Sequence, residues 1–167
     1  MKSTLLGLML ALPLVAFADA NPDASFYKNA AEAGIAEVEA GQMAQNKGND
    51  QQVKDFGAMM VKDHSAANDK LKALAASKNL TLPTSSSVGQ MAAKAKLDVL
   101  SGDTFDKSYI KNQLKAHRRA IALFNKEIAS GQDPDAKAFA SATLPTIQSH
   151  LKSIKTIAAS DGVSTKP

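Results

Sequence analysis

The sequence predicts an all-α fold, a four-helix bundle, and three observations lead to this prediction. Apolar or small residues recur at three- and four-residue spacing along four long segments, which is the pattern of a helix with one buried face. The chain contains no Trp, and aromatic residues make up only 5% of it, a composition that suits helix packing better than β-sheets. Capping and turn residues separate the segments from one another.

The first twenty residues are expected to be a signal peptide and not part of the fold. Lys2 is followed by an apolar run over residues 4–17, and Ala18-Asp19-Ala20 supplies the small-x-small pattern of a cleavage site. The run is shorter than the about 20 apolar residues that a membrane-spanning helix needs, and no later stretch is long enough either. We therefore expect cleavage near Ala20, a periplasmic or secreted protein, and no membrane insertion.

Composition excludes several classes of function. The chain has no Cys, so disulfides and zinc-thiolate sites are excluded. The net charge of +4 comes from lysines mixed with acidic residues, without the clustered basic patch that nucleic-acid binding requires. No serine or threonine has a credible neighbouring base, and no glycine-rich phosphate loop is present. A binding protein is favoured over an enzyme.

The first two predicted helices cover residues 24–46 and 50–77. Asp23 is the expected N-cap of the first helix, and a Lys-Gly pair ends it. Asn49 is the expected start of the second helix, with Gln52 three residues later in capping-box spacing. Because the connection is so short, the two helices should form an antiparallel hairpin.

The second half of the chain repeats this pattern after a longer connection, residues 79–103. Three serines inside the connection can cap a short helix over 88–100. Asp103 is then the expected cap of a helix over 104–130, and a proline opens the last helix, 134–160. These two long helices should form a second hairpin.

Two short-looped hairpins joined by a long connection predict a four-helix bundle with one crossover and a short extra helix inside it. Ferritin-like domains use this plan, and an up-down bundle with a meandering middle segment is the alternative. The bundle is expected to cover residues 21–160, and residues 161–167 are expected to be a C-terminal tail.

The chain has three histidines, and each lies on the apolar face of a different predicted helix: His64, His117 and His150. Glu37 interrupts the apolar face of the remaining long helix in the same way. All four residues fall within about seven residues of one another in height, which is roughly 10 Å along the bundle. Inward ligands at one height, one from each helix, are how helix bundles build metal sites.

Three imidazoles and one carboxylate predict a single divalent metal ion, zinc first and iron or copper next. Asp63, beside His64, and Met60, one turn before it, are possible auxiliary residues. The alternative is a non-catalytic envelope or stress-related protein that binds an unknown protein partner. In that interpretation the histidines are structural, and Glu37 pairs with one of them.

A dinuclear iron site is not expected. Such a site needs about four carboxylates and two Glu-x-x-His pairs. The residues three positions before the histidines are Val61, Leu114 and Ile147, and none of them is acidic. Ferroxidase chemistry is therefore not predicted.

Four groups of residues resemble a large family of exported bacterial proteins. They are Gly34-Ile-Ala-Glu37-Val-Glu-Ala-Gly41, Met60-Val-Lys-Asp63-His64, the segment Leu100 to Tyr109 together with His117, and Leu144-Pro145 together with His150-Leu151. The family is known as a ferritin-like domain of unknown function, and its members are often labelled outer membrane proteins. The resemblance covers nearly all of the chain after residue 20. It implies a ferritin-like bundle whose matching positions are Glu37, Asp63, His64, His117 and His150, and it implies no established activity.

Overall fold

The computed structural model describes residues 21–166, and every regular element in this part of the chain is a helix. The predicted signal peptide, residues 1–20, lies outside the described residues, as does its cleavage site. The five helices, in chain order, are α1 (Ala24–Lys47), α2 (Gln51–Ser77), α3 (Val88–Asp98), α4 (Gly102–Ser130) and α5 (Pro134–Ser160). None of them has both the length and the apolar character needed to cross a membrane.

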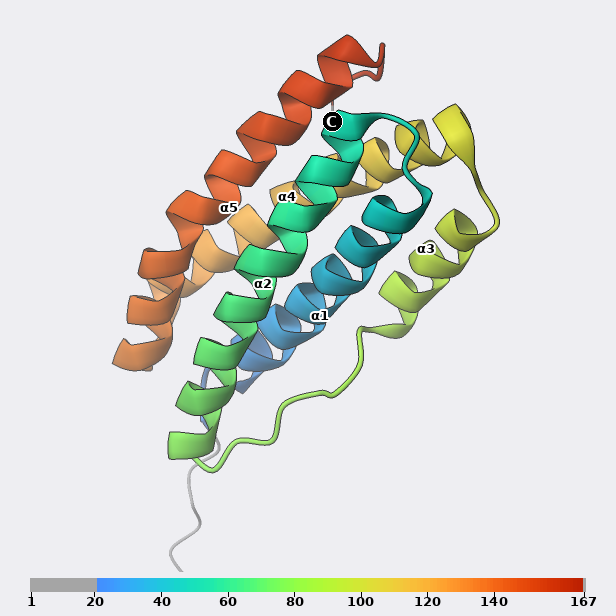
Figure 1. Ribbon diagram of the computed structural model, residues 1–167. Helices are drawn as coiled ribbons and strands as arrows, with labels where there is room; N and C mark the ends of the chain where they lie inside the picture. The colour runs from blue at the N-terminus through green and yellow to red at the C-terminus, as the bar shows by residue number, and fades with distance from the viewer. Residues whose placement is uncertain (1–20, 167) are drawn as a thin grey trace, which may run out of the picture.

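The four long helices form two antiparallel hairpins, α1 with α2 and α4 with α5 (Figure 1). α1 also packs on α4, and α2 packs on α5, so the four helices close into a bundle. Between the hairpins, residues 78–101 run back along the length of the bundle and carry α3 beside α1. The prediction of an all-α bundle with a short helix in the connection is confirmed.

Packing between α1 and α2 is close because glycines face each other across the contact. A Cβ atom built on Gly41 would lie 2.6 Å from the carbonyl oxygen of Gly57. The reverse is also true, since a Cβ atom on Gly57 would lie 2.7 Å from the carbonyl oxygen of Gly41. Any larger side chain would have to push the two helices apart.

The N-cap predicted for α1 has a different role. The Asp23 side chain makes no capping hydrogen bond to its own helix. Its carboxylate instead accepts hydrogen bonds from the backbone N–H groups of Gln132 and Asp133, just before α5. Asp23 therefore ties the start of the first hairpin to the loop of the second.

The start of α2 also depends on the second hairpin. The N-cap is Asp50, whose carboxylate accepts from the N–H of Gln52 at 2.8 Å, and not the predicted Asn49. The backbone N–H groups of Asn49 and Asp50 donate to the buried carboxylate of Asp106 on α4, at 3.0 and 2.7 Å. This carboxylate satisfies N–H groups that a helix start otherwise leaves unpaired.

The prediction for the start of α4 was wrong by two residues. The N-cap position is Ser101, and Asp103 lies in the first turn, where its carboxylate accepts from the side chain of Asn49 at 2.9 Å. A negative charge in the first turn is still favourable because of the helix dipole.

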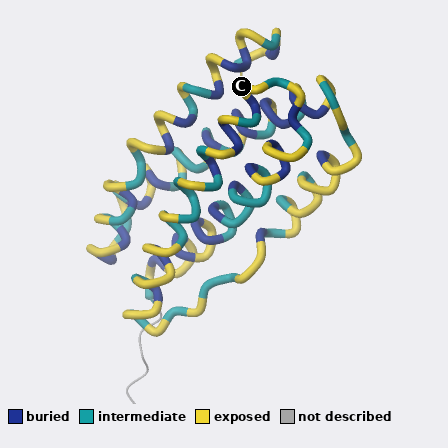
Figure 2. Tube along the Cα trace, viewed as in Figure 1, coloured by how far each residue is buried: buried dark blue, intermediate teal, exposed yellow. Residues whose placement is uncertain are grey.

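Buried apolar side chains form two separate clusters, one toward each end of the bundle. The first cluster includes Phe56, Met60, Phe105, Tyr109 and Ile154. The second includes Phe26, Leu71, Phe124, Ala140 and Ile147. Figure 2 shows buried residues along the inward faces of the long helices, whereas α3 is mostly exposed. α3 buries a single residue, Leu97, in the first cluster.

The predicted C-terminal tail packs against the bundle over part of its length. Val163 is buried in the first cluster, and its N–H donates to the carbonyl oxygen of Ala158 at 2.8 Å. The side chain of Arg118 on α4 donates to the carbonyl oxygen of Thr165. These contacts hold residues just beyond α5 close to the bundle.

Candidate metal centre

A layer of polar side chains separates the two apolar clusters. On each of the four long helices, one polar residue lies between the residues of the first cluster and those of the second. These residues are Glu37, His64, His117 and His150. Each helix places its polar residue near mid-length, between turns that carry buried apolar residues. The height matching predicted from the sequence agrees with this arrangement.

The three histidines meet in this layer. One ring nitrogen of each histidine lies within 4.8 Å of a ring nitrogen of both others. The ring centroids of His64 and His150 are 5.4 Å apart, those of His117 and His150 5.5 Å, and those of His64 and His117 5.9 Å. His117 and His150 are 1% and 2% exposed, and His64 is partly buried.

Hydrogen bonds orient two of the rings. The Nδ1 atom of His117 lies 3.0 Å from the carbonyl oxygen of Gln113, one turn earlier on α4. The Nε2 atom of His150 lies 2.9 Å from a carboxylate oxygen of Asp63 on α2. Both partners are acceptors, so these nitrogens carry the protons, and the opposite ring nitrogens keep free lone pairs.

Each histidine has one buried ring nitrogen without a hydrogen-bond partner among the described residues. These atoms are Nε2 of His64, Nε2 of His117 and Nδ1 of His150. An unpaired buried polar atom costs about 1–3 kcal/mol, and here three occur within one layer. The three histidines, called the triad below, therefore each keep a buried ring nitrogen that no described protein group pairs.

Burial keeps the imidazoles neutral. It lowers the pKa of His64 to about 3, with a further contribution from the neighbouring His117 and His150. Burial lowers the pKa of His117 to about 4, against the opposing hydrogen bond to Gln113. It also lowers the pKa of His150, although Asp63 acts in the opposite direction. At neutral pH all three rings are therefore in the form that binds metal ions.

The predicted carboxylate ligand, Glu37, lies beside the triad and outside the group of converging atoms. One of its oxygens accepts a hydrogen bond from the side-chain amide of Gln113 at 2.8 Å. Burial raises the pKa of Glu37 to about 7, while Gln113 and His150 lower it. The carboxylate is thus part of the polar layer but is not brought together with the three ring nitrogens.

The two auxiliary residues have different surroundings. Asp63 accepts a hydrogen bond from Nε2 of His150 in the triad. Met60 is fully buried in the first apolar cluster and packs there as a core residue.

Sequence reasoning missed two buried polar groups: the side chain of Gln113 in this layer and the hydroxyl of Tyr109, whose ring packs in the first apolar cluster. Both are buried, and the Gln113 side-chain oxygen and the Tyr109 hydroxyl have no hydrogen-bond partner among the described residues. Gln113 could have been found, because it lies one helical turn before His117 and so shares its face. Tyr109 lies one turn earlier still, where an aromatic residue is read as core.

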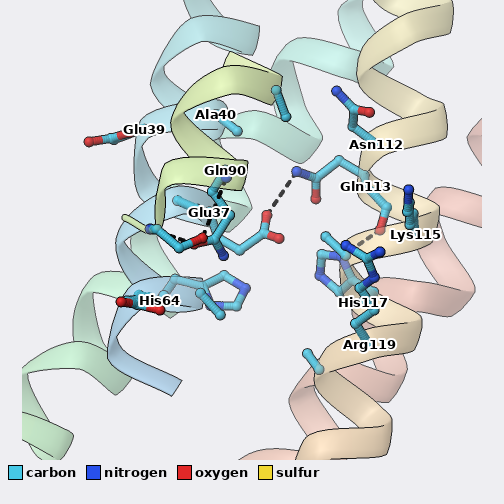
Figure 3. Close-up of a pocket in the computed structure, with 18 of the residues that line it drawn as sticks. Glu37, Glu39, Ala40, His64, Gln90, Asn112, Gln113, Lys115, His117 and Arg119 are labelled. Atoms are coloured by element: carbon cyan, nitrogen blue, oxygen red, sulfur yellow. Dashed lines mark hydrogen bonds between the residues drawn. The ribbon is translucent and has the colours of Figure 1, made fainter. Parts of the chain in front are cut away.

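A cavity of about 890 Å³ opens beside the triad and is lined by residues of all five helices. Figure 3 shows Glu37 and His64 on one side of it and Gln113 and His117 on the other, with the Glu37–Gln113 hydrogen bond between the two sides. His64 and His117 both line the cavity. The polar layer is therefore reached from the surface through this space.

The chain was compared with protein families, curated proteins and solved structures. The family model described as "Domain of unknown function (DUF4142)" matches residues 14–157. A comparison with curated proteins finds no significant match.

Solved structures with the same fold were found at low sequence identity. A DUF305 secreted protein from Streptomyces coelicolor is 16% identical, with a TM-score of 0.72, over 87% of this chain and 96% of that one. A DUF305 fragment from Deinococcus radiodurans is 10% identical, with a TM-score of 0.73, over 82% and 95%. CopM in its Cu(I)-bound form is 16% identical, with a TM-score of 0.70, over 83% and 96%.

Proposed function

The chain belongs to the DUF4142 family, whose function is unknown, and from its site we propose that it is an exported protein that binds one metal ion through His64, His117 and His150. Two observations carry this proposal: one ring nitrogen of each histidine lies within 4.8 Å of a ring nitrogen of both others, and each histidine has a buried ring nitrogen without a hydrogen-bond partner among the described residues. A single ion would pair all three at once and remove the cost of leaving them unsatisfied. Because burial holds the pKa of His64 and His117 well below 7, an ion would not have to displace protons from them at neutral pH.

The surrounding residues have positioning roles in this proposal. Asp63 pairs Nε2 of His150 and leaves its Nδ1 available, and the Gln113 carbonyl pairs Nδ1 of His117 and leaves its Nε2 available. Partners of this kind fix the tautomer and the ring orientation of a metal-binding histidine. Glu37 and the Gln113 side chain border the triad where it faces the cavity, and there the fourth coordination position would be open to water or a solute.

The donor set favours zinc or copper. Three neutral imidazoles without thiolate suit both metals, whereas iron sites in bundles of this kind rely on several carboxylates. Among the described residues, no carboxylate joins the converging group. CopM, whose structure contains Cu(I), shares the fold at 16% identity, so copper belongs beside zinc in any test. A bound zinc ion would supply Lewis acidity, and a bound copper ion would supply one-electron chemistry.

The architecture and the expected location support the same proposal. Two hairpins joined by one crossover along the bundle support a ferritin-like plan, in which sites lie in the core between facing helices. The signal-peptide pattern of residues 1–20 supports a periplasmic or secreted location. One neighbour with the same fold is itself described as a secreted protein.

Metal stoichiometry tests the proposal. The protein from Asn21 onward would be purified without a histidine tag, analysed for metal content, stripped with chelator, and titrated with Zn²⁺, Cu²⁺ and Cu⁺ in competition with a chromophoric chelator. We expect about one equivalent to bind tightly and each single change, His64→Ala, His117→Ala or His150→Ala, to weaken binding at least tenfold. Asn112→Ala, on the same helix as His117, is the control and should bind as the wild type does.

Absence of binding would contradict the proposal. If the stripped protein takes up none of these ions and its melting temperature does not respond to them, the histidines are structural. The search would then turn to a non-catalytic envelope protein with a protein partner.

A further inference from the structure

The cavity beside the triad is much larger than a metal site needs. Its volume of about 890 Å³ is within the usual range for small-molecule sites, whereas one water occupies about 30 Å³. Small and apolar side chains form most of its wall, among them Ala33, Ala36 and Ala40 on α1 and Ala116, Ala120 and Leu123 on α4. A space of this size with such walls accommodates an organic molecule with an apolar body.

One side of the cavity carries a row of positive charges. Lys111, Lys115 and Arg119 follow one another at four-residue spacing on α4, so they lie on one face of that helix, and all three are exposed and line the cavity. Across the part of the chain that the structure describes, the ion pairs involve only Lys47, Lys78 and His150, so none of the three is neutralised by a salt bridge.

α3 adds two more positive charges to the lining, Lys94 and Lys96. Acidic residues on the opposite wall do not offset this charge inside the cavity. Glu39 accepts a hydrogen bond from Ser86 and points away from the space in Figure 3. Glu37 is tied to Gln113, and burial raises its pKa to about 7. Glu32, on α1, is the remaining acidic residue in the lining. The cavity thus combines apolar walls with a mouth that has an excess of positive charge.

We propose that this cavity binds an organic anion with an apolar body, such as a carboxylate with a hydrocarbon chain or ring. The apolar part would lie between α1 and α4, and the anionic head would face Lys111, Lys115 and Arg119. The ligand needs no metal ion for these contacts, so the proposal is independent of the metal-binding function.

Calorimetric titration of the chelator-treated protein tests this proposal with three probes. Octanoate has both an apolar chain and an anionic head, octylamine has the chain with a cationic head, and acetate has the head without the chain. We expect octanoate to bind with a stoichiometry near one and at least tenfold more tightly than either of the others. Its binding should weaken as salt is raised, because exposed charges are screened. No binding of octanoate, or equal binding of octanoate and octylamine, would overturn the proposal.

Two pairs of variants locate the binding. Ala120→Phe fills the cavity from α4, whereas Ala122→Phe places the same side chain at an exposed position outside the lining. Lys115→Glu reverses a charge at the mouth, whereas Lys126→Glu does so at an exposed position on α4 outside the lining. We expect the first member of each pair to weaken octanoate binding at least tenfold and the second to leave it within twofold.

Melting curves identify any variant that fails to fold. Lys115→Glu changes only an exposed side chain, so it can still test the proposal if Ala120→Phe is unstable. Equal effects within either pair of folded variants would show that octanoate binds elsewhere and would overturn the proposal. Zinc titration of the same variants tests the metal-binding proposal independently, because a failure to bind octanoate does not change the measured affinity for zinc.

Discussion

At the scale of single residues, Asp63 acts on the site through His150, whose Nε2 atom lies 2.9 Å from its carboxylate. Removing the carboxylate leaves the Nε2 proton without its acceptor and frees the ring to turn or change tautomer. We expect Asp63→Ala to weaken metal binding about 10- to 100-fold, as loss of such a partner typically does. Competition titration with a chelator measures this change. Asp69→Ala, at an exposed position on the same helix, is the control, and equal affinities for the two variants would contradict the positioning role.

A second residue-scale prediction concerns pH and lies away from the metal site. Burial raises the pKa of Glu127 to about 7, and the nearby carboxylates of Asp23 and Asp133 raise it further, whereas Lys137 lowers it. A carboxyl group whose pKa is higher in the folded state contributes stability below its unfolded value near 4.5, and this contribution is lost as pH rises through about 7.

Glu127→Gln mimics the protonated carboxyl group at every pH. Relative to the wild type, we expect this variant to gain on the order of 1 kcal/mol of unfolding free energy between pH 5 and pH 8. Urea denaturation at the two pH values measures the gain. Asp69→Asn should show no such gain, and a variant that tracks the wild type at both values would disprove the assignment.

Much of the candidate site could be predicted residue by residue. A histidine on an apolar helix face is conspicuous, so the sequence located all three members of the triad. The neighbours were harder, because Asp63 and Gln113 act through contacts that depend on ring orientation. Glu37 was predicted as a ligand because it shares the height of the histidines. Its hydrogen bond to Gln113 depends on the separation of α1 and α4, which helical periodicity does not contain.

At the scale of helices, the contact between α1 and α2 gives a further prediction. A methyl group on Gly57 would meet the Gly41 carbonyl at 2.7 Å and the Cβ atom of Ala44 at 2.8 Å. We expect Gly57→Ala to destabilise the fold by about 1–3 kcal/mol, as overpacking does. Gly89→Ala on α3 is the control, since nothing lies within 4 Å of its Cβ position.

The control should behave in the opposite way. Alanine is a better helix former than glycine by about 1 kcal/mol, so Gly89→Ala should stabilise the fold slightly or leave it unchanged. Urea denaturation of both variants measures the difference. If Gly57→Ala were as stable as Gly89→Ala, the two helices would not be held at the observed separation.

Helix positions were predictable, and α1, α3 and α5 begin at the predicted residues, whereas the starts of α2 and α4 were missed by one and two residues. The last residues of α2, α4 and α5 agree with the predicted ends, because Gly, Pro and apolar periodicity are local signals. Asp23 stands at the N-cap position of α1 as predicted but makes no capping hydrogen bond there, and the cap of α2 is Asp50 and not the predicted Asn49. Asp23 and Asp106 satisfy backbone N–H groups of a different hairpin, and such long-range pairing has no local sequence signal.

At the scale of the whole molecule, the triad lies between two apolar clusters and joins helices from both hairpins. An ion bound there would hold α2, α4 and α5 together and would bind the folded state only. With free zinc at about 100 times its dissociation constant, the expected stabilisation is about 2.7 kcal/mol, or roughly 5–10 °C in melting temperature for a domain of this size. Calorimetric melting with zinc and with chelator measures the shift. A shift that persists in His117→Ala would contradict binding at the triad.

The overall arrangement was partly accessible from the sequence. Loop lengths predicted the two hairpins, and the long connection predicted the crossover. The cavity could not be predicted, because it depends on how α3 lies across α1 and α4 while burying only Leu97. Weak periodicity in so short a helix does not define its place on a bundle.

X-ray absorption of the protein loaded with one equivalent of zinc counts the ligands around the ion and so tests whether the three histidines bind it. We expect about three nitrogen neighbours near 2.0 Å with the outer-shell pattern of imidazole, and one neighbour fewer in His150→Ala. A first shell made of oxygen alone, or a spectrum unchanged in His150→Ala, would show that the ion is bound elsewhere and that the three histidines do not form a metal site.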